Sequence, residues 1–256
     1  MPMVDKRTFR ERRRSGAMGQ LLLSLLVVAG LPAAADSRQV YSEEAPAWLQ
    51  AVGKLQVPGS KLVNGRREHH REDCSATLVA QGSARRADTI VTAWHCLEFY
   101  NDLSRPITFT LLPGSPGSII REARRLTDGG GMHADWAVLR LLQPIATERV
   151  TALGINPLRA NPAQPITMAG YSRDGGKGNY GDQLTFDADC HITAQQATSS
   201  DSDCTAYKGA SGGAVVQHSI QGRALLSGVI SRGDSSGVSI YVPATGFHRT
   251  VIQFLR

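Results

Sequence analysis

The sequence lacks a hydrophobic run long enough to span a bilayer comfortably. Its most apolar stretch, residues 21–31, is only 11 residues long, whereas a spanning helix needs about 20. Basic residues precede this stretch, and an A-x-A cleavage pattern ends at Ala35. This layout is typical of a secretory signal peptide over residues 1–35. An uncleaved membrane anchor over residues 17–35 is one alternative. A twin-arginine signal is another, but the run of residues that should follow the arginines is missing after residues 12–14.

The exported part of the chain carries little net charge. The whole sequence has a formal charge of +6, but residues 1–35 contribute six of its 28 basic and two of its 22 acidic residues. The remaining 22 basic and 20 acidic residues leave a charge of +2. The basic balance therefore comes mostly from the export signal and gives no argument for nucleic-acid binding. We expect contact with a membrane only through that signal, and a secreted or periplasmic location.

Cysteine is scarce, and its spacing does not fit a metal site. The four cysteines all lie in the exported part: Cys74, Cys96, Cys190 and Cys204. Neither C-x2-C nor H-x3-H spacing occurs around them, which argues against zinc. An even number of cysteines in an oxidising compartment indicates two disulfides. Three pairings are open, and sequential pairing closes the shortest loops, each of which would add about 3 kcal/mol of stability.

Long segments with helical periodicity are also missing. Short apolar or alternating runs recur instead between Gly- and Pro-rich turns, a pattern typical of an all-β sandwich or barrel. We interpret them as two small barrels joined near residues 143–157. Residues 59–72 and 172–182 are predicted loops, and apolar residues at helical spacing predict a C-terminal helix over 244–256. The predicted strands are residues 47–57, 74–80, 89–93, 107–112, 118–123, 136–141, 165–171, 183–186, 190–194, 214–216, 224–230 and 238–242.

Three short motifs contain residue types suited to nucleophilic catalysis. TAWHC at 92–96 places His95 at the end of a predicted strand, and DWAVL at 135–139 places Asp135 at the start of another. GASGG at 209–213 surrounds Ser211 with small residues, which would let a carbonyl approach its hydroxyl. Each motif alone has a simpler explanation: a core histidine, a turn aspartate, or a glycine-rich hairpin loop.

Taken in order as His, Asp and Ser, these motifs resemble those of the chymotrypsin-like serine peptidases. GYS at 170–172 and Asp203-Cys204 are similar to the secreted bacterial branch of that family. The resemblance implies an all-β fold of two antiparallel six-stranded β-barrels over 36–256, with barrels near 47–148 and 149–243 and a C-terminal helix. It implies a serine endopeptidase without metal or other cofactor, acting on protein or peptide substrates. We expect a monomer, with a protein inhibitor as a further partner.

The same resemblance assigns roles to individual residues. Ser211 is the expected nucleophile, His95 its base and Asp135 the residue that orients His95. The N–H groups of Gly209 and Ser211 are the expected oxyanion hole, and Cys74–Cys96 would tie down the loop bearing His95. The expected substrate-binding residues are Thr205, Lys208, Ser231, Arg232, Gly233, Gly237 and Ser239.

Three departures from the family pattern concern activation and specificity. Ala210 replaces an aspartate that pairs with a freed N-terminus in animal digestive enzymes, so we expect activity without such cleavage. Thr205 is not acidic, which argues against Lys/Arg preference, and Ile230 replaces a histidine of glutamyl endopeptidases. We therefore expect a neutral residue before the cut. Two other classes stay open: a catalytically silent binding protein of this fold, and an α/β-hydrolase with GASGG as its nucleophile elbow.

Overall fold

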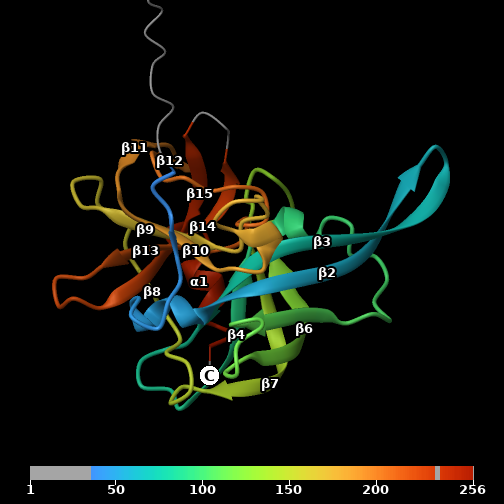
Figure 1. Ribbon diagram of the computed structural model, residues 1–256, viewed down its shortest axis with the longest axis horizontal. Coiled ribbons are helices and arrows are strands. Elements are labelled where there is room, and N and C mark those ends of the chain that lie inside the picture. Colours follow the sequence, from blue (N-terminus) through green and yellow to red (C-terminus); the bar gives the residue numbers. More distant parts are fainter. Residues whose placement is uncertain (1–35, 234–236, 256) are drawn as a thin grey trace, which may run out of the picture. The chain divides into compact units, whose positions relative to one another are not determined.

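The computed structural model describes residues 36–233 and 237–255. The predicted signal peptide over 1–35 lies outside these residues. Within the described part, no helix is both long and apolar enough to cross a membrane. The elements are almost all strands, which confirms the predicted all-β class (Figure 1). The α/β-hydrolase alternative is excluded, because that fold needs helices between its strands.

The first half of the described chain forms a closed barrel of antiparallel strands. Around the barrel the order is β2 (Val52–Val63), β3 (Arg66–Val79), β4 (Arg86–Thr92), β7 (Ala137–Ala146), β6 (Ile119–Asp128) and β5 (Ile107–Leu111). Burial alternates along β5, where Ile107, Phe109 and Leu111 are fully buried and the threonines between them are partly exposed. This period of two directs one face of each strand into the barrel core.

The second half, together with one short strand from the N-terminal end of the described chain, forms a curled nine-stranded sheet that resembles an incomplete barrel. Its order is β1 (Gln39–Val40), β10 (Thr185–Cys190), β9 (Ile166–Gly170), β13 (Ala214–His218), β14 (Ala224–Gly233), β15 (Ser239–Pro243), β12 (Ser200–Ser202) and β11 (Ile192–Gln195), with β8 (Gly154–Ile155) beside β14. The predicted pair of barrels is thus present, although the hydrogen-bonding path of the second stays open among the described residues. Sequence reasoning missed β1, β8 and β12, because two or three residues show no periodicity.

The predicted loop over residues 59–72 is wrong. These residues extend β2 and β3 into a long hairpin that is paired from Val52–Thr77 to Val63–Arg66 and projects away from the barrel (Figure 1). Asn64 and Gly65 connect the strands at φ of 51° and 76°, the left-handed conformation that two-residue hairpin turns require. The pattern failed because the hairpin is mostly exposed and has no apolar face beyond Val57.

Two segment ends also differ from prediction. The predicted first strand begins at Val52 rather than residue 47, because Ala47–Ala51 form the 3-10 helix η1. The predicted helix over 244–256 is reduced to a 3-10 turn, η4 (Ala244–Gly246), and a single turn of α-helix, α1 (His248–Val251). Phe247 and Val251 are buried as expected, and Phe247 packs on Trp136 with ring centroids 5.9 Å apart.

Candidate active site

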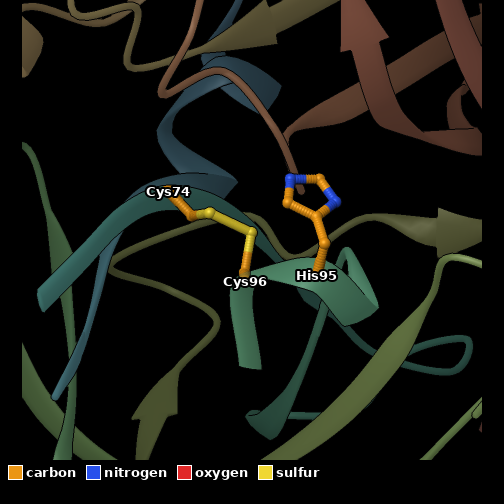
Figure 2. Close-up of side chains that lie close together, drawn as sticks. All are labelled: Cys74, His95 and Cys96. Carbon is orange, nitrogen blue, oxygen red and sulfur yellow. A yellow bond between two sulfur atoms is a disulfide. The ribbon is translucent and has the colours of Figure 1, made fainter. Parts of the chain in front are cut away.

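His95 lies in a short 3-10 helix, η2 (Trp94–Leu97), directly after strand β4. The neighbouring Cys96 is bonded to Cys74 of β3, so a disulfide fixes this helix to the barrel wall. The second disulfide joins Cys190 and Cys204, and sequential pairing is therefore confirmed. Figure 2 shows His95 beside the first disulfide. One ring nitrogen of His95 and the two sulfurs lie within 4.8 Å of one another. Sulfurs bonded to each other are not thiolate ligands, so this cluster does not fit a metal.

Asp135 is almost completely buried and holds His95 at two points. Its Oδ1 accepts the backbone N–H of His95 at 2.9 Å, and its Oδ2 lies 2.9 Å from His95 Nδ1. A carboxylate only accepts hydrogen bonds, so the ring proton must be on Nδ1. Nε2 of the neutral ring is then free to act as a base. The two predicted residues, 40 positions apart in sequence, are thus brought together.

Ser231 is a third member of this cluster that the motifs did not reveal in this role. Its buried hydroxyl donates to Asp135 Oδ2. Burial alone would raise the pKa of Asp135, but hydrogen bonds from His95 and Ser231 and the attraction of His95 outweigh it, so the pKa lies below its usual value. Asp135 is therefore a carboxylate at neutral pH. The sequence predicts Ser231 as a substrate-binding residue, and its side chain also anchors Asp135.

Ser211 comes from a different part of the chain, the loop that precedes strand β13. Its hydroxyl is 3.5 Å from the carbonyl oxygen of Ser231, and the described residues contain no hydrogen bond between it and His95. Base and nucleophile commonly come into contact only when substrate binds. His95 and Ser211 both line one pocket of about 410 Å³. The structure thus brings all three predicted residues to one site.

The loop before Ser211 leaves two backbone N–H groups available. Neither Gly209 nor Ser211 donates its N–H to an acceptor among the described residues. Gly209 has a φ of 98°, and a Cβ there would lie 2.5 Å from the carbonyl oxygen of Tyr171. Only glycine fits this position. Two backbone N–H groups without an acceptor among the described residues are the kind of donors that form an oxyanion hole.

Ser75, which follows Cys74 in β3, supports this loop and carried no signal in the sequence. Its fully buried hydroxyl donates to the Gly209 carbonyl at 2.9 Å and accepts the N–H of Tyr171 at 2.8 Å. Its own N–H donates to the Ser211 carbonyl at 2.8 Å. One residue of the first barrel therefore holds the backbone at Gly209 and at Ser211.

We expect Ser75→Ala to destabilise the fold by about 1–3 kcal/mol, because the buried Tyr171 N–H loses its acceptor. Urea unfolding measures this loss. The exposed Ser83→Ala should stay within about 0.5 kcal/mol of wild type. Equal stability of the two variants would show that the hydroxyl of Ser75 does not support the loop.

The predicted substrate-binding residues divide into two groups. Lys208, Ser231, Arg232 and Gly233 line the pocket, together with four residues that were not predicted: Met132, Ala206, Tyr207 and Ile230. Thr205, Gly237 and Ser239 do not line it. The N–H of Thr205 donates to the buried carboxylate of Asp187, and Ser239 is buried in β15.

Ala210, which the resemblance aligns with an aspartate of animal digestive enzymes, is buried. It packs in an apolar cluster that includes Val215 and Ile230. A Cβ on the neighbouring Gly170 would lie 2.8 Å from the Ala210 Cα, which shows how closely this region is packed. A carboxylate here would be buried among apolar groups.

Comparisons with known proteins agree with this geometry. Residues 74–225, more than half of the chain, match the model of the trypsin-like peptidase domain. A solved structure titled "Structure of GrC" superposes with a TM-score of 0.61 at 16% identity, over 85% of this chain and 97% of that one. A Glu endopeptidase in complex with MPD superposes with a TM-score of 0.60 at 18% identity, over 86% and 96%. At such identities the two structures support the fold alone. No curated protein matches the sequence.

Proposed function

Because the chain belongs to the trypsin-like peptidase family, we propose that it is a serine endopeptidase that cleaves peptide bonds through Ser211, His95 and Asp135. The observation that carries this proposal is the pairing of His95 Nδ1 with the buried Asp135 carboxylate beside Ser211. That pairing leaves Nε2 of the neutral ring unprotonated, and His95 lines the same pocket as Ser211. The same arrangement would be unnecessary in a core histidine.

In the proposed reaction, the Ser211 hydroxyl attacks the scissile carbonyl carbon while His95 Nε2 accepts its proton. Asp135 stabilises the resulting imidazolium, and the N–H groups of Gly209 and Ser211 donate to the oxyanion. His95 then passes the proton to the leaving amine, which yields an acyl-enzyme. Water then hydrolyses the acyl-enzyme: His95 accepts a proton from the attacking water and returns it to the Ser211 oxygen, which leaves as the hydroxyl. These steps need no metal or other cofactor.

A neutral residue is the proposed preference before the cleaved bond. Ala206, Ile230 and Met132 contribute apolar surface, and none of the residues found to line the pocket is acidic. The basic residues Lys208 and Arg232 are largely exposed to solvent, where their charges are well screened. Among residues 36–233 and 237–255, the pocket therefore offers neither a carboxylate for Lys or Arg nor a buried cation for Glu.

Export and maturation are part of the same proposal. The two disulfides fit an extracellular or periplasmic protein. We propose that residues 1–35 direct export and that the enzyme works as a monomer after their removal. A protein inhibitor that occupies the pocket is a further proposed partner.

Digestion of a mixed peptide library tests the proposed function. The exported chain should cut after neutral residues, and Ser211→Ala prepared in the same way should leave the library intact. Cuts dominated by Lys, Arg or Glu would overturn the proposed specificity. An intact library with well-folded wild type would favour the catalytically silent binding protein.

A further inference from the structure

Arg38 is almost completely buried although it is the third residue of the described chain. Its guanidinium donates to both carboxylate oxygens of Asp36 and to both of Asp174, at 2.6–3.0 Å. It also lies over the ring of Tyr207, 4.2 Å from the ring centroid. An arginine enclosed by two carboxylates and an aromatic face is well suited to hold separate segments together.

The residues around Arg38 anchor the N-terminal segment further. Lys177 donates to the carbonyl oxygens of Asp36 and Arg38. The Ser37 hydroxyl donates to Asp187 Oδ2 at 2.7 Å, the same oxygen that accepts the N–H of Thr205. Residues 36–38 are thus fixed both to the loop over 172–182 and to the segment that leads to Ser211.

The charges in this cluster persist at neutral pH. Burial alone would lower the pKa of Arg38, but Asp174 and Asp36 outweigh it and raise that pKa. Hydrogen bonds from Arg38 are in turn the largest cause of the lowered pKa of Asp36 and of Asp174. The cluster is therefore a cation between two anions.

A short path connects this cluster with the proposed oxyanion hole. Asp174 follows Arg173, whose backbone N–H donates to the carbonyl of Lys208 at 2.6 Å. In a planar trans peptide unit the C=O and the next N–H point in opposite directions. Binding of the Lys208 carbonyl to Arg173 therefore turns the Gly209 N–H away from that loop. The ring of Tyr207 lies under Arg38. The Tyr207 carbonyl accepts the Ala210 N–H at 3.0 Å and so closes the turn that contains Gly209.

We propose that Arg38 is a positioning residue, which clamps the loops at Asp174 and Tyr207 together and so holds the Gly209 N–H in place for the oxyanion. The inference rests on the proposed function, in which Gly209 supplies an oxyanion donor. Because residues 36–38 directly follow the predicted cleavage site, they would form the N-terminus of the exported chain. Trimming to Gln39 would then remove the clamp while leaving every catalytic side chain in the protein.

The test compares Arg38→Met with Arg66→Met, which removes an exposed arginine of the β2–β3 hairpin. Loss of one oxyanion donor lowers turnover by about 10²–10³-fold, and we expect Arg38→Met to lower kcat by about 10–10²-fold because the donor is displaced rather than deleted. KM should stay within about twofold, and Arg38→Lys should restore part of kcat. Equal kcat values for Arg38→Met and Arg66→Met would overturn the proposal.

Two further measurements keep the proposal testable in every case. If Arg38→Met does not fold, Asp174→Asn replaces it: a folded Asp174→Asn with wild-type kcat would contradict the clamp. If the wild type neither cleaves peptides nor reacts with a fluorophosphonate, the proposed function fails. Amide hydrogen exchange then tests the clamp separately. It should be faster over residues 172–182 and 205–211 in the Arg38 or Asp174 variant than in Arg66→Met, and equal exchange would overturn the clamp.

Discussion

Ser211→Ala is expected to lower kcat for peptide hydrolysis by about 10⁶-fold. Members of such a catalytic unit act together, so removing the nucleophile abolishes the advantage of the base and of the aspartate as well. Initial rates on a peptide chosen from the library measure the loss. The residual rate over water would come from substrate binding and the oxyanion donors.

The matched control for this substitution is Ser83→Ala, which changes an exposed serine outside the three motifs. It should leave kcat and KM unchanged. A Ser211→Ala protein that keeps more than about 1% of wild-type kcat would contradict the assignment, because a residue that only lines the pocket contributes much less than a nucleophile.

Asp135→Asn is expected to lower kcat by about 10⁴-fold at neutral pH while leaving the fold intact. The carboxylate accepts three hydrogen bonds from His95 and Ser231. An asparagine amide can present an N–H to the ring instead, which favours the tautomer with the proton on Nε2 and removes the base. Steady-state rates measure the effect, and a loss of less than about tenfold would rule out the orienting role.

The same variant tests the electrostatics of Asp135 through stability. The pKa of Asp135 is lowered in the folded protein. Its carboxylate therefore stabilises the fold at any pH above the ordinary aspartate pKa of about 3.9. As the pH falls below the usual pKa, the unfolded chain binds a proton at Asp135 before the folded protein does, and this contribution is progressively lost. It is gone once the pH has fallen through the folded pKa, where both states are protonated. Urea unfolding between pH 6 and about pH 3 should show a smaller loss of stability for Asp135→Asn than for wild type. Parallel curves would contradict the lowered pKa.

The candidate site could be predicted from the sequence because each of the three residues lies within a short motif that can be recognised without the fold. His95, Asp135 and Ser211 are predicted from the three motifs and their order. In the structure His95 and Ser211 line one pocket, and the buried Asp135 is paired with His95. Ser75 and Arg38 could not be found in this way. Their partners lie 134 and 136 positions away in sequence, at Gly209 and Asp174, so only the folded chain shows what these ordinary polar residues hold.

The fold was predictable where burial imposes a pattern and not elsewhere. Strand β5 alternates between buried and partly exposed residues and was located correctly. The β2–β3 hairpin instead depends on the Asn64–Gly65 turn and on backbone pairing, with little apolar burial. The C-terminal helix was predicted too long because Phe247 and Val251 face the core, whereas Ile252 is partly exposed and nothing favours further turns.

The most direct test of the central claim is reaction of the exported chain with a fluorophosphonate, followed by mass spectrometric mapping of the adduct. The mechanism predicts one adduct on Ser211, which forms rapidly in wild type and is absent from Ser211→Ala and strongly slowed in Asp135→Asn. An adduct on another residue, or no reaction by a folded wild type that keeps both disulfides, would contradict a nucleophilic Ser211 activated by His95.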